Sequence, residues 1–267
     1  EHARSMSITG PHGMTTDDLA AIARQAAAFF SEAGHDNGLA QATFLLGWLE
    51  QRAGNPVSAV DSGRRSLEYA QRGGALREQF SAAFLISRSL IGGPAPVPDC
   101  IEEIESLLGR QAEPHPIVMG MLARAYAMTG DFDPARQLLD RARQLIVERI
   151  RVRRLLAFIA WDSAEVETLA GDAAAAVSAY RVALTRFRSG NEAEYVGETS
   201  SRLALVLAAA GQLEEARALA DEARAVTPTD CVVVRAVATM AAARSLPADE
   251  VEASLAMAAA AVNLVPD

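Results

Sequence analysis

The sequence predicts an all-α protein built as a right-handed solenoid of about thirteen helices. Three observations support this prediction. A glycine is followed five residues later by an alanine at four places, Gly54/Ala59, Gly130/Ala135, Gly171/Ala176 and Gly211/Ala216. The last three glycines are about 40 residues apart, which is the spacing of two-helix repeats. No segment alternates apolar and polar residues as a strand would. Each helix pair must therefore bury its apolar face against the next pair.

The helices are expected in the following order. The first covers about 15–33, with Thr15 or Thr16 as its N-cap and Asp17 and Asp18 in its first turn, where the helix dipole favours negative charge. Six pairs then follow, at about 37–53 and 56–71, 75–91 and 98–109, 114–129 and 132–148, 150–170 and 172–189, 193–210 and 212–226, and 229–244 and 248–264. Proline restricts the residue before it to extended conformations, so the connector GGPAPVP is expected to be an extended loop.

The alanines of the repeat are expected to pack helix against helix. Each glycine supplies a left-handed stop for one helix, and an acidic or polar residue begins the next. Ala142, Ala183 and Ala223 follow the repeat alanines at a further seven residues. A larger side chain at Ala135 or Ala176 should destabilise the fold by about 1–3 kcal/mol through overpacking.

Composition excludes several classes of function. Half of the 267 residues are hydrophobic but only 5% are aromatic, so small side chains must fill most helix contacts. The chain has no lysine, which excludes a phosphate-binding loop and a Schiff-base lysine. The net charge of −9 opposes binding to nucleic acid or to an anionic membrane. Reduced Cys100 and Cys231 suit a cytoplasmic protein, and no apolar run is long enough to span a membrane.

The domain organisation follows from the repeat. Residues 1–13 carry Pro, Gly and two histidines without periodicity, so they are interpreted as a disordered arm or an expression remnant. Residues 14–267 are expected to form one helical-repeat domain. Its last pair ends in the apolar run Ala258 to Leu264 without a polar capping helix, which indicates a fragment or a self-association surface.

One stretch resembles tetratricopeptide repeats, since Leu122 to Tyr126 with Gly130, Ala135, Leu139 and Ala142 follows that motif. The strings GGPAPVPDCIEEIESLL, AEVETLAGDAAAAVSAYRVAL and ALVLAAAGQLEEARALADEA are similar to the C-terminal helical-repeat region of large bacterial regulators. In those regulators a class III adenylate cyclase domain and a STAND-type ATPase precede the repeats. The resemblance implies a protein-interaction or regulatory module that couples partner binding to a neighbouring signalling domain. Neither the cyclase metal-binding aspartates nor the ATPase phosphate loop is present.

No catalytic, metal or cofactor site is expected. The carboxylates of Glu102, Glu103, Glu105, Glu165 and Glu167 are interpreted as solvated helix faces. His35 and His115 lie in predicted connectors without other ligands at suitable spacing. The basic run Arg149, Arg151, Arg153 and Arg154, which follows Arg141 and Arg143, could hold an acidic partner segment or a phosphate group. The alternative is pairing with Glu148 and nearby acids at a helix junction.

We call the first helix of each pair the inner helix and the second the outer helix. The inner helices are expected to line a concave groove, which is the candidate binding surface for a protein or peptide. In the tetratricopeptide register its positions are Phe44, Trp48, Gln51, Arg52, Arg124, Met128, Phe158, Trp161 and Glu165. Tryptophan and arginine are typical anchors of protein interfaces. The alternative is that the rings fill gaps left by many alanines. A small-molecule effector sensor and a self-association module that forms a homodimer remain alternative functions. The groove lacks the lysine and asparagine set that captures chaperone tails.

Overall fold

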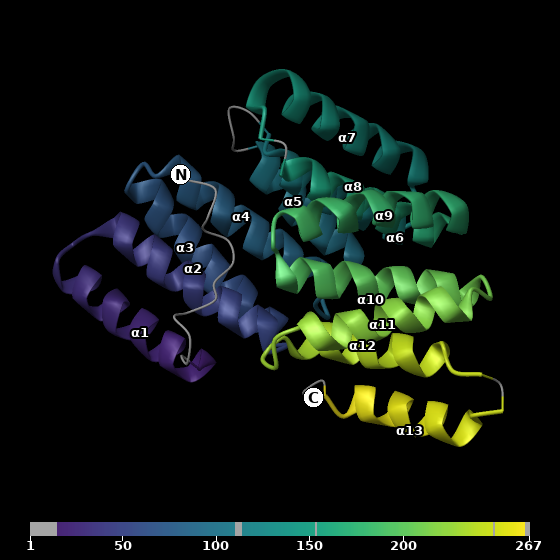
Figure 1. Cartoon of the computed structure of the whole chain (residues 1–267). Helices are drawn as coiled ribbons and strands as arrows, with labels where there is room; N and C mark the ends of the chain where they lie inside the picture. The colour runs from purple at the N-terminus through teal and green to yellow at the C-terminus, as the bar shows by residue number, and fades with distance from the viewer. Residues whose placement is uncertain (1–14, 110–113, 153, 248, 265–267) are drawn as a thin grey trace. The chain divides into compact units, whose positions relative to one another are not determined.

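The computed structural model describes residues 15–109, 114–152, 154–247 and 249–264. Within these ranges the chain is entirely helical, with thirteen α-helices, one π-helix and no strand (Figure 1). The helices are α1 (Thr16–Glu32), α2 (Asp36–Arg52), α3 (Pro56–Arg72), α4 (Leu76–Ile91), α5 (Val97–Gly109), α6 (Pro116–Met128), α7 (Phe132–Leu145), the π-helix η1 (Ile146–Ile150), α8 (Leu155–Ala170), α9 (Ala173–Ser189), α10 (Ala193–Ala209), α11 (Leu213–Val226), α12 (Val232–Arg244) and α13 (Val251–Val262). The all-α helical-repeat prediction is confirmed.

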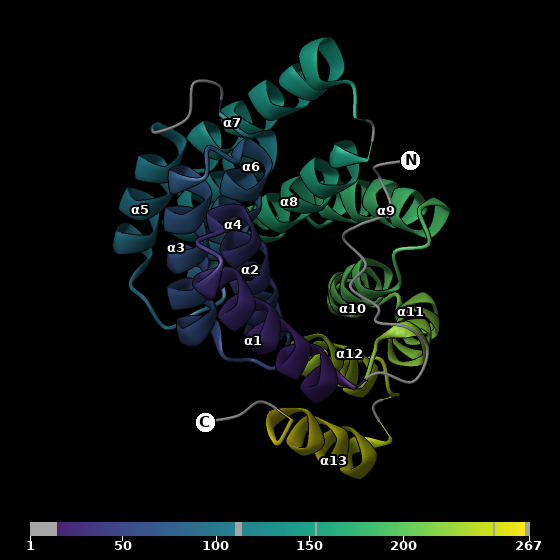
Figure 2. The same cartoon turned by 90° about the vertical axis from the view of Figure 1, so that its left-hand side faces the viewer.

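The chain divides into two compact helical units, with the boundary in the sequence between Glu113 and Pro114. In unit 1 each helix from α1 to α5 packs on the next, and α2 also packs on α4. In unit 2 each helix from α6 to α13 packs on the next, while α6 also packs on α8 and α10 on α12. Contact with the next helix and with the next but one is the pattern of stacked helix pairs (Figures 1 and 2). The single domain expected over 14–267 remains a prediction, and residues 1–13 lie outside the described residues.

The repeat alanines pack as the sequence predicts. Ala59, Ala135, Ala176 and Ala216 are completely buried, and so are Ala142, Ala183 and Ala223. The four repeat glycines have φ between 78° and 87°, in the left-handed region where a side chain is strained. The glycine therefore ends one helix, and the alanine after it lets the second helix lie close to the first.

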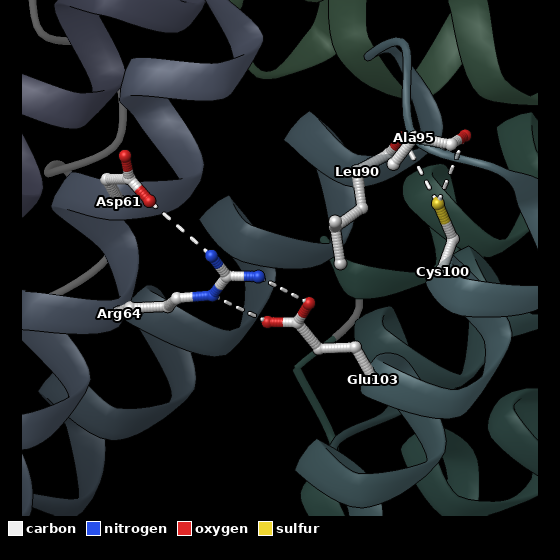
Figure 3. Close-up of polar contacts among 6 residues, drawn as sticks. All are labelled: Asp61, Arg64, Leu90, Ala95, Cys100 and Glu103. Atoms are coloured by element: carbon white, nitrogen blue, oxygen red, sulfur yellow. Dashed lines mark hydrogen bonds and ion pairs between the residues drawn. The ribbon is translucent and has the colours of Figure 1, made fainter.

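Ion pairs between outer helices recur along the repeat. In unit 1, Arg64 of α3 donates to both carboxylate oxygens of Glu103 of α5, at 3.0 and 2.7 Å, and also contacts Asp61 at 3.4 Å (Figure 3). In unit 2, Arg181 and Arg188 of α9 pair in the same way with Glu215 and Glu222 of α11. These arginines are about half exposed, so each pair contributes little stability.

Both cysteines are buried, and neither forms a disulfide among the described residues. The Cys100 thiol lies 3.5 Å from the carbonyl oxygen of Leu90 and 3.8 Å from that of Ala95 (Figure 3). Burial raises the pKa of this thiol, with smaller contributions from nearby acids. Cys100 therefore interacts with a carbonyl group at the end of α4 and with one in the connector to α5, and its raised pKa favours the protonated thiol.

The structure differs from the predicted helix boundaries mainly between α7 and α8. The sequence predicts helices over 132–148 and 150–170, but α7 ends at Leu145 and α8 begins at Leu155. The π-helix η1 occupies the first part of the interval, and its C-cap is Arg151, whose φ of 57° is left-handed. No glycine is present to stop the helix here, so the chain turns at a residue that rarely adopts this conformation.

The start of α1 follows the prediction closely. Thr15 is the N-cap, and its side chain accepts a hydrogen bond from the Asp18 backbone N–H at 3.1 Å. The Asp18 carboxylate accepts in return from the Thr15 backbone N–H at 2.9 Å. This reciprocal capping box satisfies two backbone donors that the first turn would otherwise leave unpaired.

Candidate functional site

The predicted binding residues lie on the inner helices α2, α6 and α8. Trp48 and Trp161 have only 1% and 4% of their surface exposed, and Arg52 and Phe158 are also buried. Phe44, Gln51, Arg124 and Glu165 are partly exposed, and Met128 is exposed. The buried indoles match the alternative that the rings fill inter-helix gaps. Partner binding by these nine residues stays a prediction.

In unit 2 the predicted residues Arg124, Trp161 and Glu165 lie together. The Glu165 carboxylate is 3.4 Å from Nη2 of Arg124 and 3.2 Å from Nη1 of Arg202 on α10. The Tyr180 hydroxyl of α9 donates a hydrogen bond to its other oxygen. One carboxylate therefore joins four helices, and we call Arg124, Trp161, Asp162, Glu165, Tyr180 and Arg202 the inner-helix cluster.

Asp162 gives the cluster a second negative charge. Its side chain is completely buried on α8, with Oδ1 at 4.0 Å from Nη1 of Arg124. Gly120 of α6 makes room for this carboxylate, because a Cβ atom at residue 120 would overlap Oδ2. Two arginines thus face two carboxylates, so the charges of the buried network balance.

Both arginines of the cluster lie close to the Trp161 ring. The guanidinium carbon of Arg124 is 4.5 Å from the ring centroid, and that of Arg202 is 5.6 Å away. Cations at this distance are attracted by the negative face of an indole. The indole Nε1 of Trp161 is buried and has no hydrogen-bond partner among the described residues. The ring therefore holds the arginines by its face and contributes no hydrogen bond.

Unit 1 surrounds its tryptophan mainly with other rings. The Trp48 ring stacks on Phe44 with centroids 6.2 Å apart, and Phe84 of α4 lies 6.1 Å away. The guanidinium carbon of Arg88 lies 5.9 Å from the Trp48 ring. Nearby, Ser62 donates to Glu50 at 2.8 Å, and burial raises the pKa of that carboxyl group.

The Tyr180 hydroxyl of the cluster is protonated at neutral pH. Burial, followed by the charge of Glu165, raises the pKa of Tyr180 well above its ordinary value, so its hydroxyl keeps its proton. The Glu165 carboxylate already interacts with two guanidinium groups and one hydroxyl. Across the described residues, no group of three or more His, Cys, Asp or Glu side chains could hold a metal ion.

The two histidines of the predicted connectors have local environments that explain them. His35 is the N-cap of α2, and its Nδ1 accepts the backbone N–H of Gly38 at 2.9 Å. His115 precedes α6, and burial lowers its pKa to about 4, so it is neutral at pH 7.

The arginines of the basic run have different environments: some form ion pairs and others are exposed. Arg143 pairs with Asp140 at 2.7 Å, and Arg154 turns inward to Glu192 at 2.5 Å. Arg141, Arg149 and Arg151 are exposed. Arg153 lies outside the described residues. The helix-junction alternative is therefore seen for Arg143 and Arg154, although their partners are acids other than Glu148.

Sequence reasoning missed Asp162, Tyr180 and Arg202. Asp162 and Arg202 both stand nine residues before a repeat glycine, at the same position of two inner helices. A charged residue at such a position is a signal that could have identified both. Tyr180 belongs to the outer helix α9, so a search restricted to inner helices could not find it.

Comparison with known proteins gives no family for the chain. No protein-family model matches it, and no curated protein matches it. A solved structure with some similarity is that of BtubC (BKLC) from P. vanneervenii, with a TM-score of 0.46 and 12% sequence identity over 94% of this chain and 89% of that chain. No described helix combines the length and apolar character that crossing a membrane requires.

Proposed function

We propose that the chain is a non-catalytic protein-interaction module of the tetratricopeptide kind, and that its inner helices contact the partner. One observation carries this proposal. The packing position five residues after each repeat glycine is always a completely buried alanine. The inner-helix position six residues before the glycine is instead Trp48, Arg124, Glu165 or Leu205. The scaffold is therefore repeated, while the chemistry of the inner helices changes from one pair to the next.

Four side chains of the inner helices are accessible enough to meet a partner. Phe44, Gln51 and Arg202 are partly exposed, and Met128 is exposed. The aromatic ring and amide of unit 1, and the guanidinium group and thioether of unit 2, each suit a peptide that presents apolar and polar or acidic groups. The buried tryptophans fit this proposal as supports beneath the accessible residues.

The resemblance to bacterial cyclase and STAND-ATPase regulators supports a regulatory role for such a module. In this proposal the module belongs to a larger cytoplasmic signalling or transcription regulator, and partner binding is relayed to a neighbouring signalling domain. The cluster that joins α6, α8, α9 and α10 supports the proposal because it links consecutive helix pairs into one body. A body linked in this way can transmit strain between pairs.

Affinity capture from the cells that encode the chain tests the proposal. The wild-type chain is compared with a Gln51→Ala/Met128→Ala variant, whose changes lie on the inner helices. A Val182→Ala variant is the control, because Val182 is exposed on the outer helix α9. A partner lost only with the inner-helix variant supports the proposal. Equal recovery of the same proteins by all three baits would refute it.

Self-association is a second candidate function, favoured by the surface of α13. Glu252 is the one charged residue of this helix, and Val251, Leu255 and Val262 are each more than half exposed. These three residues fall on one side of a helix of 3.6 residues per turn. Light scattering should then show dimers that dissociate in a Leu255→Glu variant. A monomer at high protein concentration would exclude this candidate.

A further inference from the structure

The junction between α7 and α8 has a surface unlike the rest of unit 2. Three branched aliphatic side chains are exposed within six residues, Val147 at 59%, Ile150 at 36% and Val152 at 46%. Arg141, Arg149 and Arg151 are exposed in the same stretch. We call residues 141–152 the junction patch. Exposed aliphatic groups among charged residues are typical of surfaces that bind other molecules.

The backbone of the junction patch is strained at Arg151, one of its exposed arginines. Arg151 has φ 57° and ψ 17°, and its N–H donates to the Ile146 carbonyl at 2.7 Å to close the π-helix. The repeat uses glycine for this conformation at Gly54, Gly130, Gly171 and Gly211. Besides Arg151, only Asn191 among the described non-glycine residues has a positive φ, and asparagine tolerates it well. A strained arginine at a position where glycine would cost less points to a use for its side chain.

The charges of the junction patch also favour a ligand. The patch contains four arginines and one acid, Glu148, whose side chain accepts a hydrogen bond from Gln144 at 2.9 Å. One of these arginines, Arg143, pairs with Asp140 just before the patch. Within the part of the chain that the structure describes, Arg141 and Arg151 form no ion pair. Most other arginines of the unit do form one, and Arg154 turns inward to Glu192. The patch is therefore a basic area on a chain whose net charge is −9.

We propose that the junction patch docks an acidic, amphipathic segment of a partner protein. Carboxylates of the segment would pair with the arginines, and its apolar residues would cover the exposed valines and isoleucine. The patch has no aromatic ring on which a base could stack. The net charge of the chain repels every anionic ligand, but it repels a short acidic segment less than a nucleic acid or an anionic membrane, because the segment carries fewer charges. This proposal is independent of partner binding by the inner helices, and each can fail without the other.

Fluorescence anisotropy with a defined probe tests the docking. The probe is a labelled 18-residue peptide of glutamate and leucine, with the leucines at helical spacing on one face. A scrambled peptide of the same composition and a version with lysine in place of glutamate are compared with it. The proposal expects saturable binding of the first peptide, weaker binding of the scrambled peptide and none of the lysine peptide. Absence of binding at 100 µM protein, or equal binding of all three, would overturn it.

Matched variants place the binding on the junction patch. Val147→Ser/Arg151→Glu should weaken binding at least tenfold. The control is Val182→Ser/Arg186→Glu, which changes an exposed valine and an exposed arginine four residues apart on α9. Less than a twofold effect is expected from the control. Equal effects of the two double variants would mean general charge attraction and would refute the docking site.

A third variant distinguishes loss of binding from loss of folding. Arg151→Gly suits the left-handed backbone, so its melting temperature should equal or exceed that of the wild type. It should nevertheless weaken peptide binding at least threefold. Unchanged binding in Arg151→Gly would overturn the proposal. Stronger binding of the protein to phosphatidylserine vesicles than to the acidic peptide would overturn it as well, because the surface would then be a membrane contact.

Discussion

The surroundings of the two tryptophans show two ways of filling the inner layer of one repeat. In unit 1, Trp48 packs against aromatic rings such as Phe84. In unit 2, Arg124 and Arg202 both lie close to the Trp161 ring. Aromatic packing changes little with salt or pH, whereas ion pairs depend on both. Two units with the same buried repeat alanines can therefore surround the tryptophan of an inner helix with either aromatic or ionic side chains.

The chain offers a direct way to observe each unit. It has two tryptophans, one in each unit. A Trp161→Phe background therefore leaves Trp48 as the fluorescent probe of unit 1, and a Trp48→Phe background leaves Trp161 as the probe of unit 2. Urea unfolding followed by fluorescence in these backgrounds gives a separate free energy of unfolding for each unit.

The largest effect is expected in the aromatic layer of unit 1. Phe84 is buried against Trp48, so Phe84→Ala should lower the free energy of unfolding of unit 1 by about 4 kcal/mol. The loss should be the same at low and high salt. Phe29→Ala is the control, because Phe29 is exposed on α1, and it should cost about 0.5 kcal/mol or less. A cost below about 1 kcal/mol for Phe84→Ala would contradict the packed layer.

The next effect separates a buried ion pair from an exposed one on the same helix. Glu165→Ala leaves the charges of Arg124 and Arg202 without their shared partner, so unit 2 should lose about 3 kcal/mol. Glu167 pairs with the more exposed Arg136, so Glu167→Ala should cost about 0.5 kcal/mol. Urea unfolding in the Trp48→Phe background measures both. Equal costs would mean that the cluster is no stronger than a surface pair.

Replacing a buried repeat alanine with leucine tests whether both units use the same close packing of helices. Ala59 of unit 1 and Ala176 of unit 2 are both completely buried, so Ala59→Leu and Ala176→Leu should each cost about 2 kcal/mol. Ala174 is exposed on the same helix as Ala176, and Ala174→Leu should change the stability by less than about 0.5 kcal/mol. A large difference between the two buried sites would confine the common register to one unit.

The smallest effect is an alkaline loss of stability in unit 2. The pKa of Tyr180 is raised in the folded chain by burial and by Glu165. The unfolded chain therefore loses this proton first, so the contribution is complete below about pH 10 and falls as the pH rises further. Tyr180→Phe removes the group and should flatten the dependence of unfolding free energy on pH above 10. An unchanged slope would show that Tyr180 ionises as readily in the fold as in solution.

Much of the fold could be predicted because its signals are local. Glycines such as Gly130 and Gly171 mark helix ends, and the acidic caps Asp131 and Asp172 mark starts. The exception is the junction between α7 and α8, where the turn is made by Arg151 in a conformation that its residue type disfavours. Nothing in the local sequence reveals a stop of this kind.

The candidate site could be predicted only in part, because burial is decided by distant neighbours. The repeat register correctly placed Arg124, Trp161 and Glu165 on neighbouring inner helices, and the structure brings them together. It could not show that Arg202 of α10 would also approach the indole. It also missed Tyr180, which reaches Glu165 from an outer helix.

A double-mutant cycle between Glu165 and Arg202 tests most directly whether the ion pairs of the inner-helix cluster stabilise unit 2. Glu165→Leu, Arg202→Leu and the double variant are compared by urea unfolding with Trp161 as the probe. We expect a coupling free energy between the two substitutions above about 1 kcal/mol, which decreases at 1 M salt. Additive effects within about 0.4 kcal/mol at both salt concentrations would contradict it.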